Sequence, residues 1–157
     1  MHLFSARDTA PAIAATTAHC TDFPRQSDEA FVHLLNAYRP SGGIARRSEV
    51  ELTVCRRTPD GLRWLDHCIA DGAVVCLDWQ ARLWLPVFQF EPARTALCPG
   101  VGEAVRELRG AMSDWQLLYW FSQPQCALAH SPPMTRVRAD PDAVVDAARQ
   151  ARFVLTG

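Results

Sequence analysis

The sequence contains no lysine, so arginine supplies all 16 of its basic residues, against 17 acidic ones and a net charge of −1. Proteins that coat nucleic acid carry an overall positive charge that holds phosphate groups. The near-neutral balance of this chain therefore excludes a globally basic nucleic-acid coat. The planar guanidinium of arginine still suits individual contacts with phosphate or carboxylate groups.

The sequence also lacks long hydrophobic runs. No apolar stretch approaches the roughly 20 residues that cross a bilayer, and the N-terminus lacks a basic region followed by an apolar run. We therefore expect a cytoplasmic protein with no membrane partner. The six cysteines form no C-x-x-C pair and lie mostly in apolar stretches, which favours free thiols in a reducing compartment over a disulfide framework.

Length and composition favour one folded unit after a short arm. A chain of 157 residues, 48% of them hydrophobic and 21% charged, has the composition of one soluble domain and needs neither metal nor disulfide to fold. Residues 1–26, rich in Ala, Thr and Pro, show no sustained period, so we predict an extended N-terminal arm. Residues 27–157 are expected to form a single compact domain, in the fold class α+β and mainly α.

Helix signals begin at Ser27, a predicted cap for a helix that Pro40–Gly43 ends. Ser48 and Glu51 match a capping box, which favours a helix through about Arg57, although Val50, Leu52 and Val54 also alternate as in a strand. Thr58 and Pro59 read as the cap and first residue of the next helix, which ends before Gly72, and their joint lacks the glycine of many such turns.

A β hairpin is predicted next, with strands over 73–79 and 83–90 and a loop at 80–82. Pro86 cannot donate a backbone hydrogen bond, so its strand is expected at an edge or with a bulge. Helix, tight joint, helix and hairpin is the order of a winged helix-turn-helix, so residues 27–90 are predicted to form a helix-turn-helix-like part.

The C-terminal part, 91–157, is predicted to be helical. One helix is expected from Val101, one after the capping box of Ser113 and Gln116, and one after Asp140, with a Pro-rich loop over 123–138. Five tryptophans are many for this length, and we expect most of them in the core. At least one of Trp79 and Trp84, which flank the hairpin loop, is expected to be partly exposed.

Positive charge is concentrated in residues 39–63, where six arginines face three acidic residues for a net of +3. This segment predicts a DNA-binding surface made by Arg46, Arg47, Arg56, Arg57 and Arg63. The competing interpretation, at about even weight, is a solvated face on which Arg46, Arg47 and Arg56 pair with Glu49 and Glu51.

Metal or nucleophilic chemistry is the weakest alternative. His19-Cys20, His67-Cys68 and Cys76 lack the paired short spacings of zinc sites, and the sequence has none of the common nucleophile or phosphate-loop motifs. A packed histidine and buried thiols are favoured. We therefore predict no enzyme activity, no catalytic or metal-ligating residues and no cofactor, with a Cys/His-dependent enzyme as a remote alternative.

The second half of the chain carries a motif series. Trp84-Leu85-Pro86-Val87-Phe88-Gln89-Phe90 is followed by Pro99-Gly100-Val101, by Ser113-Asp114-Trp115 and by Trp120-Phe121-Ser122-Gln123-Pro124. This series resembles the Xre/MbcA/ParS-type antitoxin family, over roughly residues 30–153. Within 125–137 the chain departs from the family, because Gln125 stands in place of an Asn and Ala129-His130-Ser131 in place of Gly-Gly-Arg.

The resemblance implies a small homodimeric bacterial antitoxin of a type II toxin-antitoxin system. Such a protein neutralises a partner toxin, often of the NAD-degrading or ADP-ribosylating RES type, and represses its own operon by binding operator DNA. The resemblance places the toxin-binding part in 91–157, with the predicted partner-binding residues Trp115, Trp120, Phe121, Pro124, Gln125 and His130. The alternative is a stand-alone transcription regulator or protein-interaction module without a toxin.

Overall fold

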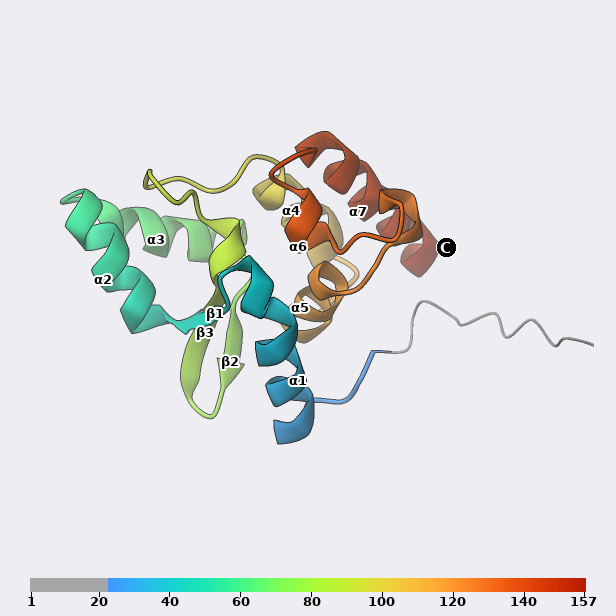
Figure 1. The fold of residues 1–157 in the computed structure, drawn as a ribbon, viewed down its shortest axis with the longest axis horizontal. Coiled ribbons are helices and arrows are strands. Elements are labelled where there is room, and N and C mark those ends of the chain that lie inside the picture. The colour runs from blue at the N-terminus through green and yellow to red at the C-terminus, as the bar shows by residue number, and fades with distance from the viewer. Residues whose placement is uncertain (1–22) are drawn as a thin grey trace, which may run out of the picture.

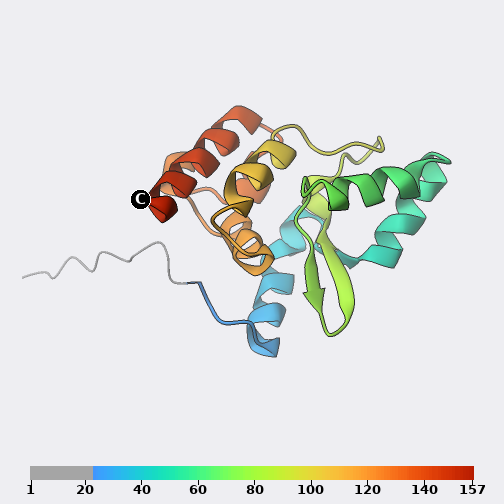
Figure 2. The same cartoon turned by 180° about the vertical axis from the view of Figure 1, so that it is seen from behind.

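The computed structural model describes residues 23–157, which form a mainly helical α+β fold with one small antiparallel sheet, as predicted (Figures 1 and 2). Within this part of the chain, no helix is both long and apolar enough to cross a membrane. The elements in chain order are α1 Asp28–Tyr38, η1 Arg39–Ser41, β1 Ile44–Arg46, α2 Arg47–Arg57, α3 Gly61–Ala70, β2 Leu77–Trp79, β3 Arg82–Pro86, η2 Val87–Gln89, α4 Val101–Arg109, α5 Asp114–Ser122, η3 Cys126–Leu128, α6 Pro133–Arg136 and α7 Pro141–Thr156.

The sheet has three strands in the order β1-β3-β2, all antiparallel, so the expected hairpin gains a third strand that the sequence did not indicate. Trp79 pairs with Arg82, which leaves Gln80 and Ala81 as a two-residue turn. Both turn residues have left-handed φ angles of 51° and 56°, the combination that fits the twist of a tight hairpin. Arg82, expected in the loop, therefore begins β3.

The prediction for Pro86 was wrong, because β3 is the central strand and no edge. Pro86 is the last residue of β3 and pairs only with Ile44 of β1. On the other side, β2 reaches only from Trp79 to Leu77, which lies opposite Trp84. Pro86 lies beyond that end, so its missing N–H leaves no gap in the β2–β3 ladder.

The two predicted strands are also shorter than expected. Residues 73–75 are buried and Cys76 is partly buried, but none of them forms a strand, since β2 begins at Leu77, and β3 gives way to the 3₁₀ turn η2 after Pro86. The backbone N–H and carbonyl of Val75 bind the side-chain amide of Gln89 instead of a neighbouring strand. The apolar run at 73–76 therefore reflects burial of an irregular segment. The hydrophobic pattern alone cannot distinguish such a segment from a buried strand.

The sheet separates two hydrophobic clusters. On one face, Val50 and Val54 of α2 pack with Leu65 of α3 and Leu85 of β3. On the other face, Trp84 joins the larger cluster, which contains α1 and the helices of the C-terminal part. Because side chains alternate along a strand, Trp84 and Leu85 point to opposite faces. Figure 1 shows the result, with α2 and α3 on one side of the sheet and α4–α7 on the other.

Trp79 and Trp84 are both partly exposed, in line with the expectation for the hairpin. Their rings fix α1 against the sheet, because Phe31 stacks on Trp79 with centroids 5.2 Å apart and meets the edge of Trp84 at 5.3 Å. A core contact therefore occupies the inner side of both tryptophans.

Several helix starts follow the sequence signals. The side chains of Ser27, Ser113 and Asp140 accept hydrogen bonds from backbone N–H groups of α1, α5 and α7, at 3.1, 3.3 and 3.2 Å. At α5 the capping box is complete, because the Gln116 side chain also accepts from the Ser113 N–H at 2.8 Å.

The predicted cap of α2 was wrong by two residues. The helix begins at Arg47, and the carboxylate of Glu49 accepts from the Arg46 N–H at 2.7 Å. Ser48 lies inside the first turn. Glu51 binds the side chain of Arg47 at 2.6 Å instead of capping the helix.

The predicted start of α3 was also wrong. Thr58 and Pro59 form the joint, Asp60 precedes the helix and Gly61 is its first residue. A Cβ at Gly61 would lie 2.4 Å from the carbonyl oxygen of Val54 in α2. The three-residue joint contains no glycine, as expected, but Gly61 follows it directly as the first residue of α3, and its lack of a side chain allows the two helices to meet.

The arm predicted for 1–26 lies mostly outside the described residues. Of the described part, Phe23 packs on the ring of Tyr119 at 5.9 Å and the carbonyl of Pro24 accepts a hydrogen bond from the indole N–H of Trp115 at 2.9 Å. The Pro-rich loop at 123–138 contains two short elements that the sequence did not indicate, η3 and α6.

Candidate functional site

The main candidate site is an apolar pocket of about 260 Å³ on the C-terminal part, which we name the α5–α7 pocket. Its walls come from the end of α5, the start of the 123–138 loop and the last three turns of α7, with Phe23 from the N-terminal side and Met112 from the segment before α5. It is lined by Phe23, Met112, Trp120, Gln125, Cys126, Ala127, Ala147, Gln150, Ala151, Val154 and Leu155. None of these side chains is charged, so the pocket suits an apolar ligand surface.

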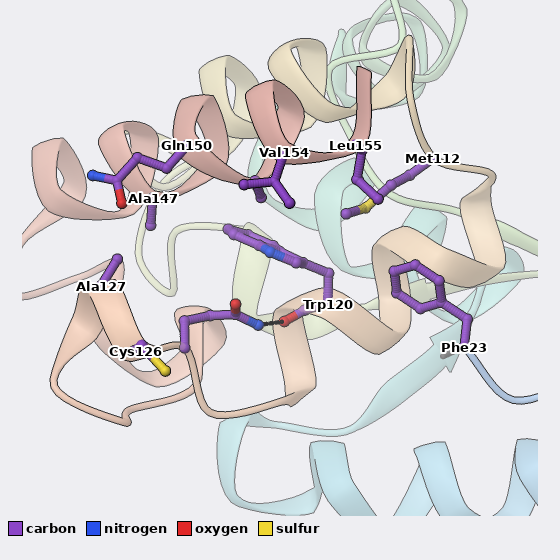
Figure 3. A pocket seen from close by; sticks show the side chains of 11 residues that line it. Phe23, Met112, Trp120, Cys126, Ala127, Ala147, Gln150, Val154 and Leu155 are labelled. Carbon is purple, nitrogen blue, oxygen red and sulfur yellow. Dashed lines mark hydrogen bonds between the residues drawn. The ribbon is translucent and has the colours of Figure 1, made fainter. Parts of the chain in front are cut away.

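Trp120 lies at the centre of this pocket. In Figure 3 its indole lies between the side chains of α7 and the loop that carries Cys126 and Ala127. Only 4% of its surface is exposed, and its edge-to-face contact with Phe121, at 4.9 Å between centroids, holds the ring in place. Its Nε1 atom is buried without a hydrogen-bond partner among the described residues.

Gln125 ties the loop to the end of α5. Its side-chain amide donates to the carbonyl oxygens of Trp120 and Gln123, each at 3.2 Å (Figure 3). The backbone of Gln125 bonds to Ser131 and His130, which closes the loop around η3. Gln125 therefore shapes the wall of the pocket as well as lining it.

The exposed apolar surface of α7 continues beside the pocket. Val154, which lines it, is 70% exposed, and the neighbouring Phe153 is 75% exposed. Large apolar side chains with this exposure at the end of a helix add a contact surface next to a concave one. The sequence analysis did not predict this contribution from α7. Helical spacing marks Val144, Val145 and Ala148 as buried, but it does not show that residues on another face of the same helix line a pocket.

The predicted partner-binding residues therefore divide into two groups. Trp115 and Phe121 are core residues, and the indole N–H of Trp115 is bound to Pro24, so their role is packing. Trp120 and Gln125 line the α5–α7 pocket. The two exposed ones, Pro124 and His130, lie in the adjoining loop but do not line the pocket.

The predicted DNA-binding arginines do not form one patch. Arg46 and Arg47 lie at the start of α2, Arg56 and Arg57 lie at its end, and Arg63 lies in α3. At 1.5 Å per residue, the two ends of α2 are about 15 Å apart. The exposed face of α3 carries Arg63 together with Asp66, so that face has no excess of positive charge.

Two of the five arginine side chains, those of Arg47 and Arg57, form hydrogen bonds with other described residues, and Arg63 lies 4.0 Å from Asp60 in an exposed ion pair. Arg47 forms ion pairs with Glu51 at 2.6 Å and with Asp66 at 2.5 Å, and the hydrogen bond to Glu51 is the main reason that its pKa is raised. These pairs join α2 to α3. The pair with Glu51 agrees with the competing interpretation, in which the arginines form ion pairs with acidic residues of the same segment. The second partner of Arg47 is Asp66 and not Glu49.

Arg57 binds three backbone carbonyls of the loop that follows η2. Its guanidinium donates to Pro92 at 2.6 Å, to Glu91 at 3.0 Å and to Arg94 at 3.3 Å. Arg57 thus holds the 91–98 loop against α2 and has few donors left for another ligand.

The residues of the enzyme alternative are not brought together. His67 is exposed on α3, and burial raises the pKa of the Cys68 and Cys76 thiols, an effect that the carboxylates of Asp71 and Asp114 reinforce. A nucleophilic thiol needs the opposite shift. Residues 23–157 contain no cluster of three His, Cys, Asp or Glu side chains that could hold a metal, and His19-Cys20 lies outside this range.

Comparison of the chain with known protein families, with curated proteins and with solved structures finds no match in any of the three. The function of the chain is therefore inferred from its sequence motifs and from the geometry of the described residues.

Proposed function

We propose that the chain is a non-enzymatic, antitoxin-like binding protein of the cytoplasm that acts as a homodimer and holds a partner toxin of the RES type at the α5–α7 pocket. The observation that supports this best is the position of Trp120 and Gln125. Both belong to the motif region that resembles the toxin-binding part of the antitoxin family, and both line the apolar pocket.

The chemistry of the pocket suits a protein ligand better than a polar metabolite. A concave apolar surface around a tryptophan, flanked by exposed apolar side chains, is the usual centre of a protein–protein interface. Here Trp120 supplies the tryptophan, and Phe153 and Val154 supply the flank. An apolar side chain of the partner would fill the pocket, and the surrounding partner surface would remove Phe153 and Val154 from water.

The test is co-expression with the product of the adjacent reading frame, followed by co-purification through a tag on that product. Val154→Asp places a charge on the rim of the pocket and is expected to abolish co-purification. Val32→Asp is the matched control, because Val32 is 54% exposed on α1, outside the α5–α7 pocket. A chain that purifies alone, or a complex that survives Val154→Asp, contradicts the proposal.

Binding of operator DNA is the second candidate function. The observation that favours it is the order of α2, a three-residue joint, α3 and the β2–β3 hairpin, which is the order of a winged helix-turn-helix. Strand β1 leads directly into α2 and pairs with β3, so the helices and the hairpin form one unit. Salt-dependent binding of the intact chain to duplex DNA tests this candidate, and a chain that binds no duplex removes it.

A further inference from the structure

An open hollow of about 350 Å³ lies between the start of α2 and the β2–β3 hairpin. It is lined by Arg46, Arg47, Ser48, Arg82 and Leu83. Three of these five residues are arginines, which come from two separate parts of the chain. We name this feature the arginine hollow.

We propose that the arginine hollow binds the phosphate backbone of duplex DNA, with Arg46 and Arg82 as its phosphate ligands. This inference rests on the second candidate function and changes where the DNA contacts lie. It assigns them to the start of α2 and the tip of the β2–β3 hairpin, where Arg82 follows the turn, rather than to the end of α2 and the exposed face of α3. Arg82 was not among the residues that the sequence indicated.

Sheet register brings these two arginines together. Arg46 pairs with Trp84 across the β1–β3 ladder, and Arg82 lies two residues before Trp84 on β3. Arg46 and Arg82 are therefore diagonal neighbours on one face of the sheet, about 7–8 Å apart at their Cα atoms. Arginine side chains are long enough to converge on one phosphate from such positions.

The charges of these two arginines are not neutralised by any acidic side chain of the described residues. Neither Arg46 nor Arg82 takes part in any ion pair of residues 23–157, and both are exposed. Arg47, in contrast, is already paired with Glu51 and Asp66. Two guanidinium groups are thus free to bind an anion.

Trp84 holds one of them in position. The guanidinium carbon of Arg46 lies 5.4 Å from the centre of the Trp84 ring, a cation–π contact that orients the group without using its N–H donors. The donors of Arg46 therefore stay available for phosphate oxygens. Ordering a side chain before binding lowers the entropy that binding costs.

The shape of the arginine hollow favours a polymer backbone over a free nucleotide. Its lining has one apolar side chain, Leu83, and no aromatic ring on which a base could stack. The hairpin tip points away from α4–α7 in both views, which leaves this end of the molecule accessible to a long duplex (Figures 1 and 2).

The experiment measures binding of the intact chain to a 30-base-pair duplex of mixed sequence, by fluorescence anisotropy over a range of salt concentrations. Each lost phosphate contact lowers the slope of log K against log salt by about 0.9. We expect Arg46→Gln/Arg82→Gln to lower it by about 1.8 and Arg82→Gln alone by about 0.9. The single variant keeps the test valid if loss of the Arg46–Trp84 contact unfolds the double variant.

Arg56→Gln/Arg63→Gln is the matched control, with the same change in charge on α2 and α3, and should keep the wild-type slope. This inference is overturned if the control variant shows a smaller salt dependence of binding while the variants of the arginine hollow keep the wild-type salt dependence. That result would still support DNA binding as a function of the chain. A wild-type chain that binds no duplex overturns both. A further outcome would be that inorganic phosphate binds, seen as shifted Nε–H signals of Arg46 and Arg82 by NMR, while the duplex does not bind. The hollow would then be a site for free anions, and this result would also overturn the assignment to DNA.

Discussion

The side-chain amide of Gln89 forms two hydrogen bonds with the backbone of a single residue, Val75. Its oxygen accepts from the Val75 N–H at 2.9 Å, and its nitrogen donates to the Val75 carbonyl at 2.9 Å. Gln89 has no exposed surface. Its amide thus replaces the neighbouring strand that residues 73–76 lack, and it connects the end of the sheet to the segment that follows α3.

Replacing this amide should destabilise the fold. Gln89→Leu leaves the N–H and carbonyl of Val75 buried without partners, at a cost of about 1–3 kcal/mol for each group. We expect the free energy of unfolding to fall by about 2–4 kcal/mol, measured as a lower midpoint in urea with an unchanged m value. Gln26→Leu, at an exposed position, should change it by less than about 0.5 kcal/mol. A similarly small effect of Gln89→Leu would contradict the role of this amide.

The joint between α2 and α3 supplies a second prediction. The Cβ of Gly61→Ala would lie 2.4 Å from the Val54 oxygen and 2.6 Å from its carbon, both backbone atoms that cannot turn away. We expect a loss of about 1–3 kcal/mol, measured by urea unfolding. Gly110→Ala is the control, because no atom lies within 4 Å of its Cβ position, and it should leave stability unchanged or raise it. Equal effects of the two substitutions would rule out close helix contact as the cause.

The helix starts show which parts of the fold can be predicted from the sequence. Caps such as Ser27 and Ser113 act within one turn of their own helix, so a local pattern is enough to find them. Thr58 and Pro59 give an equally good local pattern, but the start of α3 depends on how closely Gly61 approaches α2. Long-range contacts of this kind are absent from any local pattern.

The candidate sites show the same division. The resemblance to a family indicated Trp120 and Gln125, and both line the pocket. Val154 and Leu155 line the pocket because of how α7 packs on α4 and η3, and no pattern in the sequence indicates this packing. Arg82 lies 36 residues after Arg46, and only the register of β1 on β3 brings the two together.

Arg57 gives a prediction that separates a structural role from a DNA contact. Arg57→Ala removes the donors that bind the carbonyls of Glu91, Pro92 and Arg94. We expect faster amide hydrogen exchange in residues 91–98 and an unchanged salt slope of duplex binding, because these donors are already occupied. Arg56→Ala, at the preceding exposed position, should leave the exchange unchanged. A lower slope for Arg57→Ala without faster exchange would show a DNA contact instead.

Tyr38 makes stability depend on pH on the alkaline side. Its hydroxyl donates to the Leu118 carbonyl at 2.6 Å, and complete burial raises its pKa well above the usual value of 10.0. In the unfolded chain Tyr38 releases its proton near pH 10, whereas the folded chain retains it to higher pH. The stabilising contribution is therefore complete below about pH 10 and is lost as the pH rises toward the folded-state pKa. The thiols of partly buried Cys68 and Cys76 and of buried Cys98, whose pKa values are also raised, add a loss that begins nearer pH 9.

Tyr38→Phe isolates the part of this dependence that belongs to Tyr38. The variant keeps the packing against Phe88 but has no proton to lose, so its stability should fall less steeply than that of the wild type above pH 10. At pH 7 the lost hydrogen bond should cost about 0.5–1.5 kcal/mol. Urea unfolding at pH 7, 9, 10 and 11 measures both effects. The control is Tyr119→Phe, which removes the only other tyrosine hydroxyl and should keep the wild-type pH dependence. Parallel pH profiles for the wild type and Tyr38→Phe would mean that ionisation of Tyr38 does not limit alkaline stability, and the thiols would then account for the whole loss.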